Sequence, residues 1–272
     1  MHKVIAEFDK LLNIAKEAAL VGANILKDSD SSLKETQYNG LHDVQLKADE
    51  VAEKNIVSYL SSETDIDIIS EEMWKASPNK VFKDSSDLLW VVDPLDGSYN
   101  FLYNIPFYCI SIALWQGRKS PILGVIYNFY TNELFSGIVG KGSWFNNIKI
   151  RTTDTKDIGK AILCTGFPVN IDYSTENLTK YIYKIRDWGK IRLFGSAGLS
   201  LAYVASGRVD AYQEEDIMFW DVAAGISLVR AAGGMVDFMF SDERDLKMKV
   251  VATNNHLRIE DKIEEGKLGS QT

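Results

Sequence analysis

Two aspartates, Asp93 and Asp96, stand three residues apart on a tight turn that follows an apolar run at 88–92. The run is continuous, as in a strand buried on both faces, and Pro94 and the Asp96-Gly97 pair then end it with turn signals. Two like charges at the end of a buried strand are unfavourable unless a cation lies between them. The spacing therefore fits a divalent metal site, although an ordinary Asp-Gly loop in which Asp93 caps its own turn fits the same residues.

Acidic residues also end or open two other predicted elements. A strand-like run at 66–69 ends in Ser-Glu-Glu at 70–72, and Asp221 opens a small-residue stretch that stops at Gly233. That stretch is typical of a helix with Asp221 at its N-terminus and glycine as its stop signal. Three separate element ends therefore each present an acid, which favours the metal interpretation over the ordinary loop.

Three motifs, in this order, resemble those of the inositol monophosphatase family of metal-dependent phosphatases. They are S-E-E at 70–72, D-P-L-D-G-S-x-N-F at 93–101 and W-D-x-A-A-G at 220–225. The order of predicted elements is also similar from about residue 5 to about residue 262. The second and third motifs are specific in combination, whereas either one alone is weak. The resemblance implies an α+β / α/β fold, the layered αβαβα sandwich of the inositol monophosphatase / fructose-1,6-bisphosphatase type.

The resemblance also implies a site for two or three Mg²⁺ ions. Glu71, Asp93 and the Leu95 carbonyl would bind one ion. Asp93 would bridge to a second ion, held also by Asp96 and Asp221, and a weaker third ion would lie near Glu71. These donors are all hard oxygens, a set that favours Mg²⁺ over zinc or copper. The three histidines of the chain have no metal-ligand spacing.

The catalytic residues that the resemblance implies are Glu71, Ser98 and Asp43. The Ser98 hydroxyl would orient the attacking water at a position where the family usually has threonine, so the β-branch that restrains the threonine rotamer is lost. Asp43 matches an acidic residue that the family has near the second metal. A cap at the entry of the following helix also explains Asp43.

The implied substrate contacts are Gly97, Ser98, Ser196, Glu214 and Asp221. Glycine at position 97 lets the backbone amides approach a phosphate closely. Glu214 stands where related enzymes bind substrate hydroxyls, although the acidic run 214–216 also fits a solvated loop.

The elements that must position these residues fall into two halves. Residues 1–155 predict an α+β lobe, with amphipathic helices at 5–26 and 48–60 and an antiparallel meander over 107–150. Residues 156–272 alternate strands and helices, which indicates an α/β lobe. We expect one structural unit with the site at the junction, since clefts between lobes are common ligand sites. The other predicted features are a loop or frayed hairpin at 27–40, a loop at 73–87, helices at 177–188, 196–206 and 221–232, strands at 191–194, 210–212, 235–238 and 250–253, and a C-terminal helix.

Composition restricts the class of protein. The 272 residues are 46% hydrophobic and carry a net charge of −8, which indicates a globular chain and disfavours a nucleic acid partner. Cys109 and Cys164 are distant from each other and predict free thiols in a reducing compartment. Acids at positions 7 and 9 argue against a signal peptide, and no apolar run reaches membrane-spanning length. We expect a soluble cytoplasmic protein, and the resemblance implies a homodimer and inhibition by Li⁺.

The sequence therefore predicts Mg²⁺-dependent hydrolysis of a small phosphate monoester, such as inositol monophosphate or a related polyol or sugar phosphate. The alternative is a 3′-phosphoadenosine 5′-phosphate phosphatase or a fructose-1,6-bisphosphatase of the same superfamily. Lys190, Arg192 and Arg208 could reach a second anionic group, and they equally fit surface charges. An aspartyl-phosphate enzyme commonly has its acids two residues apart, and a kinase would need a P-loop that is missing here. A non-enzymatic metal-binding scaffold would lack a ligand, and none is missing.

Overall fold

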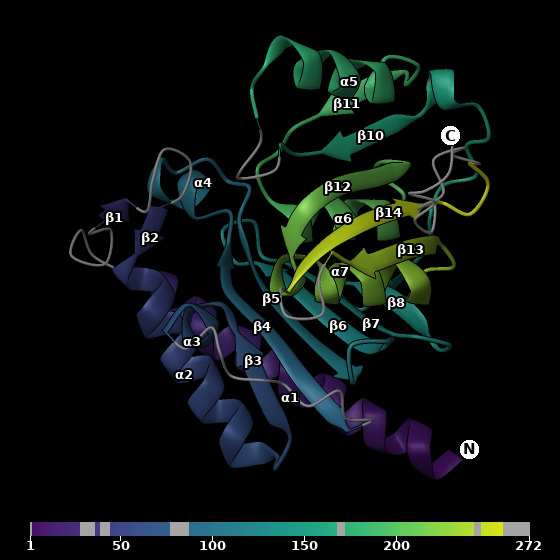
Figure 1. Cartoon of the computed structure of the whole chain (residues 1–272). Helices are drawn as coiled ribbons and strands as arrows, with labels where there is room; N and C mark the ends of the chain where they lie inside the picture. Colours follow the sequence, from purple (N-terminus) through teal and green to yellow (C-terminus); the bar gives the residue numbers. More distant parts are fainter. Residues whose placement is uncertain are drawn as a thin grey trace, which may run out of the picture.

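The structure is a computed structural model that describes residues 2–27, 36–38, 44–76, 87–167, 172–241 and 246–257. Figure 1 shows successive layers of outer helices, a seven-stranded sheet, two central helices, a five-stranded sheet and one further outer helix. This is the layered arrangement that the sequence predicts, so the fold class is confirmed. The candidate site residues lie on elements that meet between the two sheets.

The first half of the chain supplies the outer helices and the seven-stranded sheet. Its helices are α1 (His2–Lys27), α2 (Lys47–Glu63), α3 (Glu71–Ala76) and α4 (Ser98–Leu102). The sheet has the order β3-β4-β5-β6-β7-β8-β9, and within it only β3 and β4 run parallel. The strands are β3 (Asp67–Ser70), β4 (Leu88–Asp96), β5 (Cys109–Gln116), β6 (Ser120–Asn128), β7 (Glu133–Ile138), β8 (Gly142–Phe145) and β9 (Ile148–Ile150).

Strand β4 explains the continuous apolar run of the sequence. Its side chains alternate between two hydrophobic clusters: Trp90 and Val92 pack with the outer helices, whereas Leu89 and Val91 pack with the central helices. Because both faces of the sheet are covered, apolar residues are needed at consecutive positions. The strand therefore carries its last residues, the acids, directly into the space between the layers.

The central helices are α6 (Ala197–Ala205) and α7 (Phe219–Ala231), and α7 lies close against the first sheet. Small residues make this approach possible, because a Cβ placed on Gly124 of β6 would lie 2.4 Å from the carbonyl oxygen of Ala224 in α7. The Trp115 Nε1 of β5 also donates a 3.1 Å hydrogen bond to the Ala223 carbonyl. The A-A-G part of the motif at 220–225 is therefore a packing surface.

The second half of the chain forms the five-stranded sheet, in the order β11-β10-β12-β14-β13. Strands β10 and β12 are parallel, whereas β14 is antiparallel to both of its neighbours. The remaining helices and strands are η2 (Ile158–Lys160), β10 (Ile162–Thr165), α5 (Thr175–Ile185), β11 (Lys190–Arg192), β12 (Ala211–Met218), β13 (Met235–Phe240) and β14 (Lys247–Thr253). Helix α5 forms the outer layer, where its Ile185 packs on a small cluster built around Trp188 and Leu163.

Several predicted boundaries in this half are wrong. Helix α7 begins at Phe219, with Met218 as its N-cap, so Asp221 is its third residue, and strand β14 begins at Lys247. The strand predicted at 210–212 continues to Met218, with a bulge between Glu214 and Ile217, so the run 214–216 is part of a strand and not a loop. The bulge places Asp216 at a φ of +55°. The helix predicted at 177–188 begins two residues earlier and ends three earlier, because Ser174 caps it by accepting a hydrogen bond from Asn177 N.

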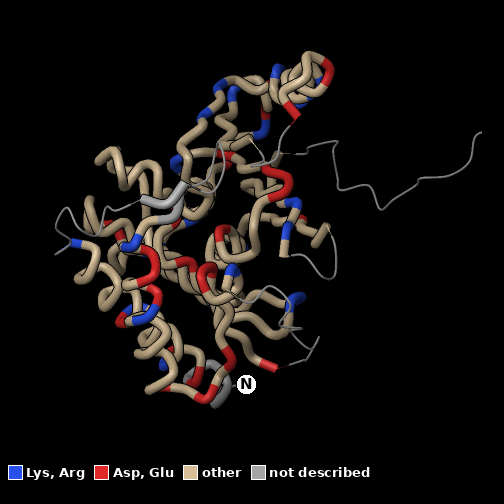
Figure 2. The backbone as a smooth tube through the Cα atoms, turned by 60° about the vertical axis from the view of Figure 1, so that its left-hand side comes forward, with Lys and Arg blue, Asp and Glu red and all other residues tan. Residues whose placement is uncertain are grey.

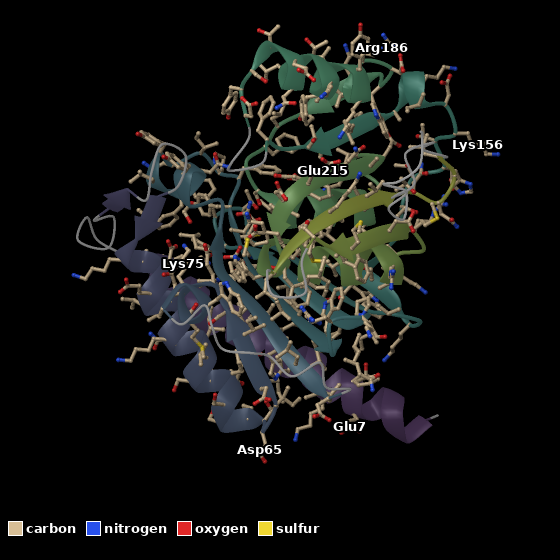
Figure 3. All side chains as sticks on the ribbon, viewed as in Figure 1. Glu7, Asp65, Lys75, Lys156, Arg186 and Glu215 are labelled. Atoms are coloured by element: carbon tan, nitrogen blue, oxygen red, sulfur yellow. The ribbon has the colours of Figure 1, made fainter. Side chains whose placement is uncertain are left out.

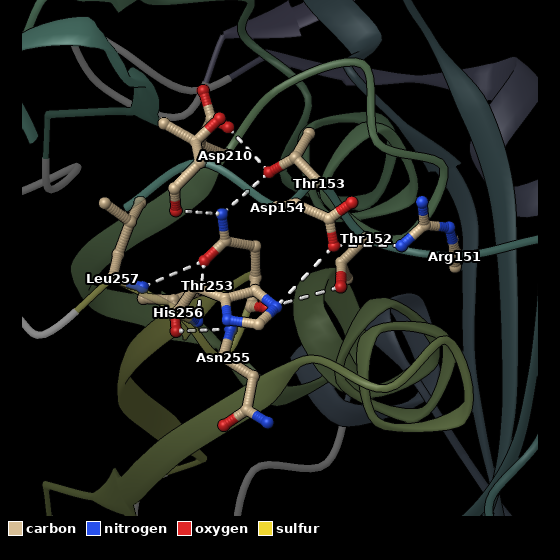
Figure 4. A network of polar contacts seen from close by, with 11 residues as sticks. Arg151, Thr152, Thr153, Asp154, Asp210, Thr253, Asn255, His256 and Leu257 are labelled. Carbon is tan, nitrogen blue, oxygen red and sulfur yellow. Dashed lines mark hydrogen bonds and ion pairs between the residues drawn. The ribbon is translucent and has the colours of Figure 1, made fainter. Parts of the chain in front are cut away.

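A polar network fastens the connection between the sheets, residues 151–157, onto the second sheet (Figure 4). The buried Asp210 accepts hydrogen bonds from Thr153 Oγ1 at 2.6 Å and from Ile162 N at 2.7 Å. Asn254 donates to Thr153 Oγ1 at 2.7 Å and to the Thr155 carbonyl at 2.8 Å. The predicted boundary between the lobes, at residues 155 and 156, falls in this connection, and the division into lobes 1–155 and 156–272 within one structural unit stays a prediction.

Strands β1 (Thr36–Tyr38) and β2 (Val44–Leu46) pair antiparallel, so part of the predicted hairpin region is a hairpin. The predicted loop at 73–87 begins with helix α3, and its residues 77–86 lie outside the described part of the chain, as does the predicted C-terminal helix. Among the described residues, no helix is both long and apolar enough to cross a membrane.

Candidate active site

Asp93 and Asp96 are both buried at the end of β4. The pairing of β4 with β5 is interrupted between these two residues, where Pro94 has no N–H to donate. Within this irregular turn, Leu95 N donates a 2.9 Å hydrogen bond to Asp93 Oδ1. The local sequence therefore interrupts the regular pairing of β4 with β5 between the two aspartates, and the backbone amide of Leu95 fixes the carboxylate of Asp93.

Gly97 follows at a φ of +86°, a conformation that glycine adopts without strain. A Cβ at this position would lie 3.0 Å from the Phe107 carbonyl oxygen and 3.2 Å from that of Gly195. Ser98 then begins α4, and its hydroxyl donates a 3.0 Å hydrogen bond to the Leu95 carbonyl. The predicted water-orienting hydroxyl and the predicted metal-binding carbonyl are therefore direct neighbours.

Glu71 and Asp221 come from two other elements. Glu71 is the first residue of α3, where its Oε1 lies 2.9 Å from Nζ of Lys75. Lys75 is labelled in Figure 3. Asp221 lies in the first turn of α7, where its Oδ2 accepts a 3.2 Å hydrogen bond from Met218 N. Acids in the first turn of a helix are favoured by the helix dipole, so both positions are locally stable for a carboxylate.

The four carboxylates share one electrostatic field. Burial raises the pKa of Asp93 well above its usual range, and the charges of Glu71, Asp221 and Asp96 raise that pKa further. Burial likewise raises the pKa of Asp221, followed by the charges of Glu71 and Asp96. The pairing of β3 with β4 and the hydrogen bond from Ser111, opposite Asp93, to the Trp220 carbonyl bring α3, β4 and α7 together. A cation between such mutually repelling carboxylates would be favoured.

The donor set fits magnesium. Among the described residues, no three His, Cys, Asp or Glu side chains form a ready-made metal-binding group. Asp93, Asp96 and Asp221 each bind a donor of the protein through one carboxylate oxygen, and these bonds leave the other oxygen to a ligand. Mg²⁺ keeps several waters and is held by a few carboxylates together with substrate phosphate, so an open set of oxygen donors suits it better than a closed cage.

Glu214 faces the same site from the second sheet. Its Oε2 accepts a 2.8 Å hydrogen bond from the Tyr212 hydroxyl, and Gly166 lies so close that a Cβ there would be 2.4 Å from Glu214 Oε1. Burial raises the pKa of Glu214 to about 7 despite the Tyr212 hydrogen bond, and the charge of Asp96 adds to the rise. Its neighbour Glu215 is instead paired with Lys184 and Lys249, each at 3.0 Å.

Comparison with known proteins decides the family. The model of the inositol monophosphatase family matches residues 7–267 of this sequence. The chain belongs to the inositol monophosphatase family. It is thus a member of a family of phosphatases that hydrolyse phosphoric monoesters, and the resemblance in the motifs is confirmed.

Relatives of this inositol monophosphatase family member align over most of their length. It is 34% identical to inositol monophosphatase 3 of Solanum lycopersicum over 258 residues, which are 92% of this chain and 94% of that protein. It is 39% identical to the Nus factor SuhB of Xylella fastidiosa over 236 residues, 85% of this chain and 83% of that protein. The solved inositol monophosphatase of Anabaena (Nostoc) sp. PCC 7120 superposes with a TM-score of 0.77 at 31% identity, covering 92% of each chain.

Some predicted residues of this family member are not brought to the site. Arg208 is bound to Glu133 at 2.7 Å and packs over the rings of Phe145 and Tyr203, so it serves the packing of the core. The Arg192 side chain is exposed and donates a hydrogen bond to the neighbouring Ile191 carbonyl. Asp43 lies outside the described residues, so its catalytic role stays a prediction.

Two acids of α2 that no sequence motif points to, Asp49 and Glu53, lie beside the start of α3. Asp49 is only 3% exposed, its Oδ2 accepts a 3.0 Å hydrogen bond from Leu46 N, and its Oδ1 has no partner among the described residues. Burial raises the pKa of Asp49 well above its usual range, and the charge of Glu71 raises that pKa further. Glu53 accepts a 2.8 Å hydrogen bond from Glu72 N and thereby holds the start of α3 in place.

Proposed function

We propose that this protein hydrolyses a small phosphate monoester, inositol monophosphate or a related polyol or sugar phosphate, in a reaction that depends on Mg²⁺. The observation that carries the proposal is that the elements with Glu71, Asp93, Asp96 and Asp221 meet. Glu71 follows the pair Ser70–Val92 of β3 and β4, and Ser111, opposite Asp93, donates to the carbonyl of Trp220 before Asp221. Acids that repel one another so strongly are poorly arranged for stability alone, and they are well arranged for binding cations.

Glu71, Asp93, the Leu95 carbonyl, Asp96 and Asp221 would hold two or three Mg²⁺ ions. When bound, these ions would neutralise charge on the phosphoryl oxygens and lower the pKa of a water. Each ligand is fixed by the fold: Asp93 by Leu95 N, Asp221 by Met218 N and Glu71 by its place at the start of α3. Such preorganised ligands need little rearrangement when the substrate arrives.

Ser98 and Glu71 would orient the attacking water. The Ser98 proton is directed to the Leu95 carbonyl, which leaves lone pairs of Ser98 Oγ to accept a hydrogen bond from that water. Glu71 would accept the proton that the water releases, and Asp43 stays a further candidate for this role. The amides of Gly97 and Ser98 would bind the phosphate oxygens, because the glycine lets the backbone approach closely.

The remainder of the substrate would contact Glu214 and Asp221, whereas Ser196, the third contact expected from the sequence, is buried with its hydroxyl bonded to Asp96. A carboxylate at Glu214 accepts hydrogen bonds from polyol hydroxyls and repels a second phosphate. We therefore favour a monophosphate over 3′-phosphoadenosine 5′-phosphate or fructose 1,6-bisphosphate. Arg208, a candidate cation for a second phosphate, is already paired with Glu133.

The partners proposed from the sequence are small molecules and a second copy of the chain. Figure 2 shows acidic and basic residues interspersed on both halves of the backbone, and the net charge of −8 disfavours a nucleic acid polymer. Tyr103, Ile105 and Leu193 are at least half exposed on adjoining segments, which supports a homodimer. The free, buried Cys109 and Cys164 support a cytoplasmic location.

The test is phosphate release from inositol 1-phosphate, 3′-phosphoadenosine 5′-phosphate and fructose 1,6-bisphosphate, each with Mg²⁺ and with a chelator. We expect turnover that needs Mg²⁺ and a higher kcat/KM for inositol 1-phosphate. Asp93→Asn should abolish turnover while the protein stays folded. Asp65→Asn is the matched control, because Asp65 is an exposed acid at the periphery (Figure 3) and should leave turnover unchanged.

Three results would contradict the proposal. Mg²⁺-dependent turnover retained in Asp93→Asn would refute the role of this ligand. A preference of tenfold or more for a bisphosphate would move the assignment to the sister enzymes. Trapping of a covalent phosphate on Asp93 or Asp96 would replace direct attack by water with aspartyl-phosphate chemistry.

A further inference from the structure

The carboxylate of Asp96 is held by a helix that lies about 100 residues further along the chain. Asp96 ends β4 in the first sheet, yet its Oδ2 accepts hydrogen bonds from the Ser196 hydroxyl and from Gly198 N at 2.8 Å, both at the start of α6. The Cys109 thiol donates a third, longer bond at 3.5 Å. None of these three donors binds Oδ1.

The Ser196 hydroxyl is both a hydrogen-bond donor and a hydrogen-bond acceptor. It donates its proton to Asp96 Oδ2, and it accepts a 3.2 Å hydrogen bond from Leu199 N as the N-cap of α6. Gly198 N, another of the N-terminal amides that have no partner inside a helix, is satisfied by the same carboxylate. Asp96 and Ser196 together therefore complete the first turn of α6, and both side chains are almost fully buried.

Gly198 leaves the space that this carboxylate occupies. A Cβ on Gly198 would lie 2.9 Å from Asp96 Oδ2 and 3.1 Å from Cys109 Sγ, closer than real Cβ atoms ordinarily approach. The start of α6 therefore accommodates Asp96 in two independent ways. The Ser196 hydroxyl donates a hydrogen bond to its carboxylate, and the absence of a side chain at Gly198 leaves space for that carboxylate.

We propose that Ser196 is a positioning residue for metal binding. Its hydroxyl fixes Oδ2 of Asp96 so that Oδ1 is presented to the ion, and the first turn of α6 and the metal-binding turn move as one unit. The inference rests on the proposed function, because it assumes that Asp96 holds Mg²⁺. Partners that orient a metal ligand typically contribute tenfold to a hundredfold in metal affinity.

The test measures Mg²⁺ binding directly, by calorimetric titration of the full chain without substrate. Ser196→Ala should weaken Mg²⁺ binding by about tenfold to a hundredfold. Ser196→Thr keeps the hydroxyl and the cap, so it should bind within about twofold of wild type. Ser200→Ala is the matched control, because Ser200 is another buried serine of α6, and its hydroxyl donates to the Ser196 carbonyl and not to Asp96.

A second variant, which keeps the Ser196 hydroxyl, tests the position of Asp96 in case Ser196→Ala does not fold. Gly198→Ala improves intrinsic helix propensity while its new methyl group displaces Asp96. It should therefore weaken Mg²⁺ binding in a titration run well below the melting temperature of the chelated variant, a temperature that loss of the bonds between Asp96 and the start of α6 should lower. Wild-type Mg²⁺ affinity in Gly198→Ala would overturn the inference, as would wild-type affinity in Ser196→Ala.

Substrate kinetics separate positioning from direct contact. At saturating Mg²⁺, Ser196→Ala should keep its KM for inositol 1-phosphate. A raised KM with unchanged Mg²⁺ affinity would instead mean that Ser196 touches the substrate, and an equal loss of Mg²⁺ affinity in Ser200→Ala would mean a general structural effect. If the wild type binds Mg²⁺ but releases no phosphate from any substrate, the proposed function fails while the positioning role is still decided by the titration.

Discussion

Glu214→Gln should stabilise the metal-free protein, and the gain should grow with pH. The pKa of Glu214 is raised from 4.5 to about 7, first by burial. A raised carboxyl pKa means that the folded state binds a proton more tightly, so this contribution to stability is present below the unfolded pKa and is lost as pH rises through the folded value. Glutamine is neutral at every pH, so the variant does not lose stability at this position as the pH rises.

The expected gain in the free energy of unfolding follows from the pKa shift of Glu214. At 1.36 kcal/mol per pKa unit, a change from 4.5 to about 7 amounts to about 3 kcal/mol as an upper bound, since the side chain keeps some exposure. Most of that difference develops between about pH 5 and about pH 8. Glutamine can still accept the Tyr212 hydrogen bond, so the substitution removes the charge and keeps the contact.

The assay is urea unfolding of both proteins in chelator at about pH 5 and about pH 8, with stability taken from the linear extrapolation. The matched control is Glu215→Gln. Burial alone would raise the pKa of Glu215, but hydrogen bonds from Lys249 and Lys184 lower it overall. Its charge therefore stabilises the fold above the unfolded pKa, and glutamine at 215 should destabilise the protein at the higher pH. A Glu214→Gln advantage that does not change with pH would refute this account of the site.

Two further variants test the chemistry and the metal affinity. Ser98→Ala should lower kcat by about 10²–10⁴-fold, the usual contribution of a positioned proton acceptor, and steady-state kinetics of Ser98→Ala beside Ser98→Thr would show whether the hydroxyl alone restores turnover. Lys75→Ala removes a cation at 2.9 Å from Glu71, so half-saturation by Mg²⁺ should need up to about fivefold less metal, a factor equivalent to about 1 kcal/mol. Lys54→Ala is the matched control, because Lys54 is an exposed lysine near Lys75. If Lys54→Ala lowers the Mg²⁺ concentration for half-saturation equally, the effect comes from net charge and not from the contact with Glu71.

The sequence identified what is local, and it missed what depends on distant packing. Asp93 and Asp96 could be predicted because one short segment contains both the apolar strand and the turn that ends it. Asp49 could not, because an acid in the first turn of a helix is common, and only the fold buries it beside Glu71. The bond from Ser196 to Asp96 joins the start of helix α6 to a strand of the first sheet and has no local signal.

Errors in the predicted elements have the same origin. The acidic run 214–216 has the composition of a loop, but pairing with β14 on both sides of the bulge keeps it in a strand. Successive side chains of a strand point to opposite faces, so Glu214 and Glu215 have different partners. The end of α5 is set by contacts of Ile185 and Trp188 with the second sheet, which no window of sequence contains. Local propensity is overruled where tertiary partners satisfy the backbone differently.

The close approach of α7 to β6 has a consequence for maps of deleterious substitutions. Asp221 stands one turn from Ala224, whose carbonyl rests against Gly124. Any side chain at Gly124 would push the helix away from the sheet and carry Asp221 with it, although Gly124 lies inside a strand and contacts neither metal nor substrate. In a mutational scan that measures activity, substitutions of Gly124 should therefore be as harmful as substitutions of the acids of the site. The cause would be the increased distance between helix α7 and the first sheet.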